Sequence, residues 1–163
     1  MSSPENGSAE KSRRRFGGTV AQIRAALGFY KVFAYTTGVL LLLLTAELVA
    51  RYGFHSVLMA GGQDASSGAE HGFGFVSVAD DGSLAVTGGV NLSTAVLIVH
   101  GWMYVVYLIS DFRLWSLMRW RFGKFVLIAL GGVVPFLSFF VERRIHAETL
   151  AEVAANPQGS KRY

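Results

Sequence analysis

One stripe of polar side chains lies within an otherwise apolar stretch and is the part of this sequence best suited to chemistry. Its members follow one another at spacings of four, three and four residues: His100, Tyr104, Tyr107 and Asp111. Residues at such spacings share one face of a helix. A face of this kind could relay protons, supply a haem ligand through His100, or hold neighbouring helices together by hydrogen bonds.

Two of these three roles lack supporting residues elsewhere in the chain. Haem often takes a second axial residue, and the other histidines, His55, His71 and His146, all fall outside the apolar stretches. A proton relay lacks an acidic residue in the middle of any apolar stretch. We therefore interpret the stripe as an interhelical contact surface, and we expect no bound cofactor.

The third apolar stretch carries a proline that should weaken its helix. Pro135 has no N–H, so the carbonyl of Gly131 loses its usual helical partner, and in hydrocarbon that carbonyl must be bonded by protein or water. At a rise of about 1.5 Å per residue, His100 falls at the level of Pro135 when the helices lie side by side. We predict that His100 donates to the Gly131 carbonyl, directly or through a water molecule, and we count Ser138 among the interhelical contacts.

Charged residues are expected to gather at the outer ends of the first and third apolar stretches. Such a group is either a solvated salt-bridge network or a docking rim for another membrane subunit. Its members are Glu47, Arg51, Glu142, Arg143 and Arg144.

No motif in the chain indicates a particular enzymatic reaction. Cysteine is absent, which excludes disulfides, thiolate metal sites and cysteine nucleophiles. The sequence also lacks the GxSxG and HExxH motifs and a phosphate-binding glycine loop. His55 and His71, with four nearby acidic residues, match no known metal-site spacing. The sequence therefore indicates a protein without catalytic activity and without a metal site.

The composition is typical of a membrane protein. Of the 163 residues, 52% are hydrophobic and only 16% are charged, and the mean hydropathy is +0.39. Three stretches approach the roughly 20 apolar residues that cross a bilayer, at 29–50, 92–110 and 122–141. A signal peptide is the alternative for the first, but its apolar run exceeds the usual length of roughly 7–15 residues. The predicted fold is an all-α membrane protein with three transmembrane helices.

Residues 51–91, between the first two spans, differ from the spans in composition. They include nine glycines and four acidic residues and, apart from Arg51, no lysine or arginine, as expected of an extracytoplasmic loop. Two β-prone runs, 73–78 and 84–87, flank an Asp-Gly turn at 80–83, which predicts a small β-hairpin. Because an isolated hairpin is marginal in water, its aromatic residues should rest on the membrane, the helix ends or another protein.

The two terminal segments are polar. Residues 1–18, with three consecutive arginines at 13–15, predict a disordered cytoplasmic tail that meets anionic headgroups. A membrane domain then covers residues 19–155, and residues 156–163 form a flexible tail after the helix-ending Asn-Pro pair.

The distribution of cations predicts the orientation. Ten lysines and arginines lie on the side of the N-terminus and five on the other, which favours a cytoplasmic N-terminus and an extracytoplasmic C-terminus. Arg143 and Arg144 stand on the wrong side in this arrangement. The basic connection at 111–124 carries Trp115 and Trp120, which is typical of an inner-leaflet interface rather than of nucleic-acid binding.

Four parts of the chain resemble a known family. They are the segment AYTTGVLLLLL followed by Glu47, the segment IVHGWMYVVYL around His100-Gly101, the pair Arg119-Trp120, and the segment VVPFLSFFVERR. These parts are similar to the small three-span membrane proteins of actinobacteria that are classed as a domain of unknown function. The resemblance covers residues 30–144 apart from the acidic loop.

The resemblance implies this fold and a place in the bacterial plasma membrane, but no established activity. Many relatives carry an acidic residue where this chain has Thr37, which argues against a carboxylate-dependent mechanism at that position. Similar members have been linked to the periphery of actinobacterial respiratory cytochrome assemblies.

These observations predict a non-catalytic accessory subunit that packs its polar stripe and its hairpin against a larger complex of the plasma membrane. The expected partners are membrane lipids and other integral membrane subunits, with a respiratory cytochrome complex as one candidate, and not nucleic acid. The alternative is a small transporter or channel formed by self-association, although the chain shows no internal repeat of the kind that transporters use.

Overall fold

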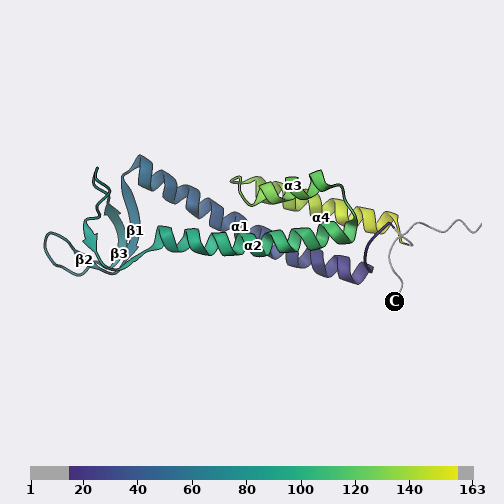
Figure 1. Cartoon of the computed structure of the whole chain (residues 1–163), viewed down its shortest axis with the longest axis horizontal. Helices are drawn as coiled ribbons and strands as arrows, with labels where there is room; N and C mark the ends of the chain where they lie inside the picture. Colours follow the sequence, from purple (N-terminus) through teal and green to yellow (C-terminus); the bar gives the residue numbers. More distant parts are fainter. Residues whose placement is uncertain (1–14, 158–163) are drawn as a thin grey trace, which may run out of the picture.

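The computed structural model describes residues 15–157, and this part of the chain is mostly helical (Figure 1). Its four helices are α1 (Val20–Gly53), α2 (Leu92–Met118), α3 (Phe122–Gly131) and α4 (Leu137–Ala155). Five short strands follow α1 and precede α2: β1 (Ser56–Ala60), β2 (Gln63–Asp64), β3 (Phe73–Ser77), β4 (Val86–Thr87) and β5 (Val90–Asn91). The strands gather at one end of an elongated helical bundle.

Helices α1 and α2 run antiparallel along the bundle and are both long and apolar enough to cross a membrane. Thr19 and Gln22 form a capping box at the start of α1, and the Asn91 side chain accepts from the Thr94 N–H at the start of α2. Only 17% and 6% of their most apolar windows are buried. The core helix of a soluble protein would be mostly buried, so these exposed apolar surfaces favour lipid as their surroundings.

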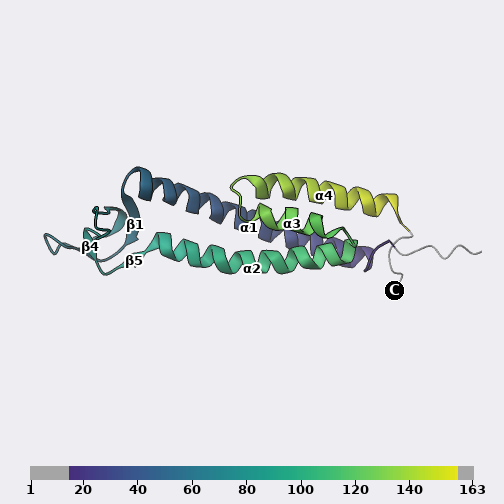
Figure 2. The same ribbon diagram turned by 45° about the horizontal axis from the view of Figure 1, so that its top comes forward.

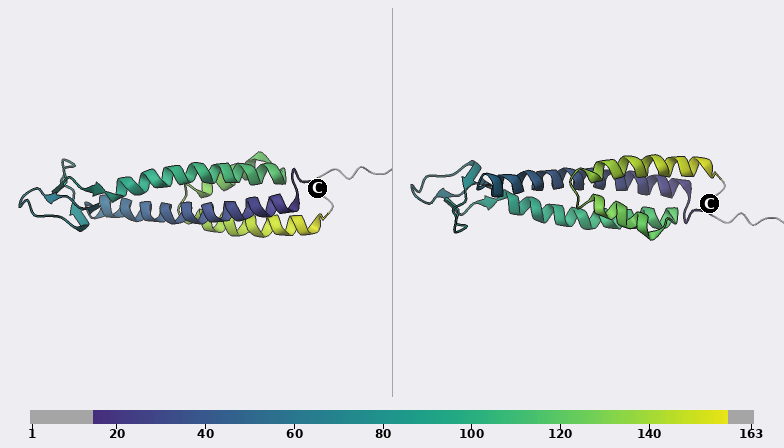
Figure 3. Two further views of the ribbon diagram at one scale, coloured as in Figure 1. Left: turned by 90° about the horizontal axis from the view of Figure 1, so that it is seen from below. Right: turned by 90° about the horizontal axis from the view of Figure 1, so that it is seen from above.

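The predicted third span at 122–141 is wrong as a single helix. Helix α3 ends at Gly131, and after a turn α4 runs back alongside it, so that both cover the same half of α1 and α2 (Figures 2 and 3). The turn contains Pro135, which cannot continue the hydrogen-bond ladder, and Phe136, whose φ of 66° is left-handed. The proline therefore lies between two helices and does not kink one.

This reversal places the first and last described residues at the same end of the bundle (Figure 1), whereas the sequence predicts a cytoplasmic N-terminus and an extracytoplasmic C-terminus. Arg15 Nη2 lies 2.6 Å from Glu152 Oε1, so the first described residues contact the last helix. Part of the predicted disordered tail is ordered here, because Phe16 is buried and the Gly17 N–H donates to the Leu117 carbonyl at 2.7 Å. Residues 1–14 and 158–163 of the predicted tails lie outside the described chain.

Small residues let α4 approach α1 closely. Ala34 and Gly38 are buried, and a Cβ built on Gly38 would come within 3.2 Å of the Ser138 Cβ. The Ser138 hydroxyl donates to the Ala34 carbonyl at 2.8 Å. Ser138 is thus an interhelical contact between α1 and α4.

The predicted hairpin is present at its turn but is only part of a larger β module, defined here as residues 56–91. Val78 and Leu84 form an isolated bridge, and the Ala79 N–H donates to the Ser83 carbonyl at 2.9 Å. The strands on either side do not pair with each other, since β3 pairs with β1 in a sheet of order β3-β1-β5, and β4 pairs with β2. The extra strands give the module a core that a lone hairpin lacks, made of Val57, Met59, Val76 and Val86.

Candidate functional site

Two tyrosines of α2 bond the carbonyls at the end of α3. The Tyr107 hydroxyl donates to the Ile128 carbonyl at 2.6 Å, and the Tyr104 hydroxyl donates to the Ala129 carbonyl at 3.1 Å. Carbonyls in the last turn of a helix have no partner within it, and here the chain turns away directly afterwards. Tyr104 and Tyr107, two of the four residues in the predicted polar stripe, therefore form an interhelical contact surface between α2 and α3.

Of the two predicted forms of the contact between His100 and the Gly131 carbonyl, the direct hydrogen bond is not found among residues 15–157. The His100 ring stacks on Tyr104 with centroids 6.3 Å apart, and its Nδ1 has no hydrogen-bond partner within residues 15–157. The two tyrosines lie one and two turns further along α2, where they face the end of α3 directly. A Cβ on Gly131 would come within 3.2 Å of the Tyr107 hydroxyl, so its lack of a side chain keeps this contact open.

A buried polar interior lies where α1, α2 and α4 meet. Tyr30 of α1 and Tyr107 of α2 are both fully buried, with ring centroids 5.8 Å apart. Asp111 on α2 and Glu142 on α4 are buried to 0% and 2% exposure. Sequence reasoning did not single out Tyr30, because a tyrosine near the start of an apolar helix also fits an interfacial position.

The two buried carboxyl groups lack the partners that usually accompany them. Both oxygens of Asp111 and Oε1 of Glu142 have no hydrogen-bond partner in the described part of the chain. The His146 ring lies one turn further along α4, with 3.8 Å between its Nδ1 and Oε1 of Glu142, which is too long for a hydrogen bond. Burying a carboxyl group without hydrogen bonds costs free energy, so this interior is a candidate site for a proton or a small polar ligand. Across residues 15–157, no three His, Asp or Glu side chains are placed to hold a metal ion.

The predicted charged cluster at an outer boundary does not form. Glu47 and Arg51 lie near the β module, whereas Glu142 lies one turn beyond Ser138, which contacts Ala34. Counting along α1 at 1.5 Å per residue, Glu142 is about 25 Å from Glu47. The reason is the reversal of α4, which carries Glu142, Arg143 and Arg144 back toward the start of α1.

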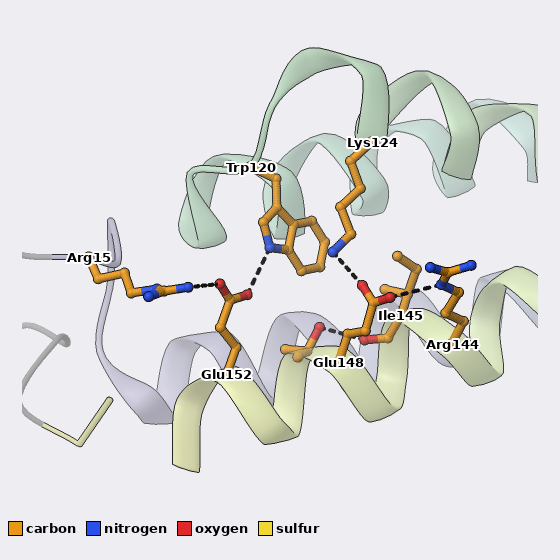
Figure 4. Close-up of polar contacts among 8 residues, drawn as sticks. Arg15, Trp120, Lys124, Arg144, Ile145, Glu148 and Glu152 are labelled. Atoms are coloured by element: carbon orange, nitrogen blue, oxygen red, sulfur yellow. Dashed lines mark hydrogen bonds and ion pairs between the residues drawn. The ribbon is translucent and has the colours of Figure 1, made fainter. Parts of the chain in front are cut away.

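A ladder of polar contacts instead joins α4 to the α2–α3 connection (Figure 4). Glu152 accepts from Arg15 at 2.6 Å and from the Trp120 indole N–H at 3.0 Å. Burial favours the neutral form of Glu152, but these hydrogen bonds outweigh burial and hold its pKa below the usual range. Trp120 is thus part of a tertiary contact in addition to any interfacial role.

Glu148 forms the second rung of the ladder, one turn earlier on α4. Lys124 Nζ lies 2.5 Å from Glu148 Oε2, and Arg144 Nε lies 2.8 Å from Oε1. Lys124 also lies over the Trp120 ring, 3.8 Å from its centroid. The hydrogen bonds from Lys124 and then Arg144 hold the pKa of Glu148 below its usual range. The spacing of Glu148 and Glu152 predicts a polar helix face, but only the reversed chain brings it to Lys124 and Arg15.

Replacement of Tyr107 by phenylalanine should destabilise the bundle more than the same change at Tyr104. The Ile128 carbonyl would lose its tyrosine partner in a buried site, at a cost of about 1–3 kcal/mol. The Ala129 carbonyl also accepts from the Gly132 N–H at 3.1 Å, so Tyr104→Phe should cost less than about 1 kcal/mol. Unfolding in mixed detergent micelles measures both variants, and equal losses would contradict the assignment.

Acidification should weaken the ladder through Glu148. Because the pKa of Glu148 is lower in the folded chain, its ion pairs stabilise the fold fully above the ordinary glutamate pKa of about 4.3. That stabilisation is lost as the pH falls through the lowered value of the folded state. The melting temperature should therefore fall below about pH 4 in the wild type and less steeply in Glu148→Gln.

The matched control for this titration is Glu70→Gln. Glu70 is exposed in the β module and forms no ion pair in the described chain, so its pH profile should match the wild type. If the melting temperature of Glu148→Gln depended on pH in the same way as that of Glu70→Gln, the ion pairs of Glu148 would not contribute to the acid sensitivity of the fold.

Comparison with known proteins shows where this fold belongs. The family described as Domain of unknown function (DUF3817) matches residues 27–147. The chain is 31% identical over 119 residues to "Uncharacterized protein ML1176" of Mycobacterium leprae, covering 73% of this chain and 71% of that protein. It is 29% identical over 142 residues to "Uncharacterized protein Rv1342c" of Mycobacterium tuberculosis, covering 87% and 89% respectively. No solved structure matches the chain. The predicted membership is confirmed, and the chain belongs to the DUF3817 family of actinobacterial proteins.

Proposed function

We propose that the chain is a multi-pass protein of the bacterial plasma membrane in which α1 and α2 cross the bilayer. Their apolar windows are largely exposed, and large apolar side chains such as Leu43, Ile98 and Trp102 point away from the protein interior. Helices α3 and α4 then enter from one side and return to it, because α3 has only 10 residues and spans about 15 Å.

Charge supports placing the side with both described ends in the cytoplasm. The β module carries no lysine or arginine, whereas the opposite half of the bundle is rich in cations. They are Arg15, Arg24, Lys31, Arg113, Arg119, Arg121, Lys124, Arg143 and Arg144. Because α4 runs back toward the start of α1, Arg143 and Arg144 also lie on the proposed cytoplasmic side. Both cations of α4 therefore follow the positive-inside rule.

The role we propose is that of a non-catalytic accessory subunit, and one observation carries it. Strand β3 is the edge of its sheet, and its outward side chains Phe73 and Phe75 are 75% and 66% exposed. An uncovered edge strand with exposed aromatic residues favours pairing with another chain. The partner is a larger complex of the same membrane, and the family resemblance makes a respiratory cytochrome assembly the first candidate.

A self-associating transporter is the second candidate, favoured by the buried carboxyl groups. Asp111 and Glu142 occupy the kind of position where ionisable residues in membrane helices accompany ion or proton pathways. A homo-oligomer could continue such a pathway between chains.

Cysteine labelling tests the proposed orientation, and the absence of native cysteine makes it direct. A membrane-impermeant maleimide should label Ala79→Cys in intact cells, because the β module lies outside. Ala154→Cys, exposed near the end of α4, should react only after permeabilisation. Labelling of both variants in intact cells would restore the opposite placement of the two ends.

Purification in mild detergent tests the accessory role. The wild type should be recovered with larger membrane subunits, and the double variant Phe73→Ala/Phe75→Ala should be recovered alone. Phe122→Ala, an exposed aromatic at the other end of the bundle, is the control and should keep its partners. Recovery of the wild type as a monomer, where respiratory assemblies stay intact, would overturn the proposal, and a defined homo-oligomer would favour the transporter.

A further inference from the structure

A groove of about 450 Å³ lies between α1 and α2, on the half of the bundle next to the β module. It exists because the α3–α4 hairpin covers only the other half, and Val133 and Pro135 of the turn between these helices contribute to its lining. The walls are mainly apolar, with Leu44 and Leu48 from α1 and Leu97 from α2. From Leu41 to Arg51 the groove follows α1 for about 15 Å, which is half the thickness of the hydrocarbon core.

The open end of the groove carries two opposite charges that do not pair with each other. Glu47 and Arg51 both line it, one helical turn apart, a spacing at which such side chains often form an ion pair. Across residues 15–157 neither forms one, and Oε2 of Glu47 is buried without a hydrogen-bond partner. The groove thus presents a separate anionic group and a separate cationic group.

The start of α2 adds to the positive side of this end. Ser93 and Thr94, in its first turn, line the groove, and that turn holds no acidic residue. The N-terminus of a helix attracts phosphate through its N–H groups and dipole, and an arginine guanidinium binds phosphate strongly. Arg51 and the first turn of α2 therefore suit a phosphate, while the Glu47 carboxylate suits an ammonium group that can donate hydrogen bonds.

We propose that this groove binds a phospholipid with a phosphoethanolamine headgroup. The phosphate lies between Arg51 and the start of α2, the ammonium group donates to Glu47, and one acyl chain follows the leucine-lined walls. A phosphatidylglycerol headgroup carries no cation that could donate to Glu47. A choline headgroup carries a cation, but it has no N–H that could donate to the buried oxygen of Glu47. The inference rests on the proposed placement of α1 and α2 across the bilayer.

The size of the groove favours a lipid chain over a helix of a partner protein. A helix with its side chains is about 10 Å across, which is wide for a groove of about 450 Å³ whose lining includes residues of the α3–α4 turn. A partner helix would have to displace the α3–α4 turn, whereas a single acyl chain needs no such movement.

Native mass spectrometry of the purified full chain tests the proposal, with dioleoyl phosphatidylethanolamine, phosphatidylglycerol and phosphatidylcholine as probes. The wild type should retain one phosphatidylethanolamine and bind it about tenfold more tightly than either other lipid, the gain expected from one charge-assisted hydrogen bond. Glu47→Gln should remove most of this preference, and Arg51→Gln should weaken all three lipids.

Steric variants give the matched control. Leu97→Trp fills the groove and should reduce phosphatidylethanolamine retention about tenfold, whereas Ile98→Trp, an exposed neighbour outside the groove, should retain the lipid. Equal retention by these two variants, or no preference of the wild type among the three lipids, would overturn the inference. If Ala79→Cys is labelled in intact cells and either of these results occurs, only the lipid site fails. If Ala79→Cys is not labelled there, the proposed crossing of α1 and α2 fails and the lipid site fails with it.

Discussion

The carbonyl groups at the end of α3 must find hydrogen bonds within the protein, and the rest of the bundle depends on how they do so. Helix α3 stops after 10 residues, so its last carbonyls would face hydrocarbon if α1 and α2 cross a bilayer. Tyr104 and Tyr107 meet this requirement from α2. With the Ile128 and Ala129 carbonyls bonded, the chain turns at Pro135 and returns as α4.

The return of α4 makes the two halves of the bundle different. In the half that holds the described ends, four helices enclose a buried interior, and Glu148 and Glu152 connect α4 to Lys124 and Arg15. In the other half only α1 and α2 remain, which leaves a groove beside them. The position of the α3–α4 turn therefore decides which half of α1 and α2 is covered by helices and which half is left with a groove. The β module lies only at the far end of the uncovered half.

The elements that depend on local sequence could be predicted, whereas those that depend on tertiary contacts could not. Two apolar helices and the Asp-Gly turn at 80–83 follow from hydropathy and turn chemistry. The third apolar stretch fits one full span as well as a short helix and a turn, since Pro135 is compatible with both. The choice depends on the contacts of Glu148 and Glu152 with other parts of the chain. Their partners there are Lys124, Trp120 and Arg15, which lie 24 residues or more away in sequence. The pairing of β3 with β1 is similarly non-local and has no turn sequence to mark it.

The buried carboxyl groups are the part of the structure that packing does not require. Tyr107 bonds the end of α3 and Ser138 joins α4 to α1, so the helices have polar contacts that already fix their positions. Asp111 and Glu142 add no hydrogen bond to these contacts within residues 15–157, and their burial carries a cost that apolar residues would avoid. They also lie on different helices, Asp111 on α2 and Glu142 on α4, so a small polar ligand that bonded both would connect these two helices where the packed side chains alone do not.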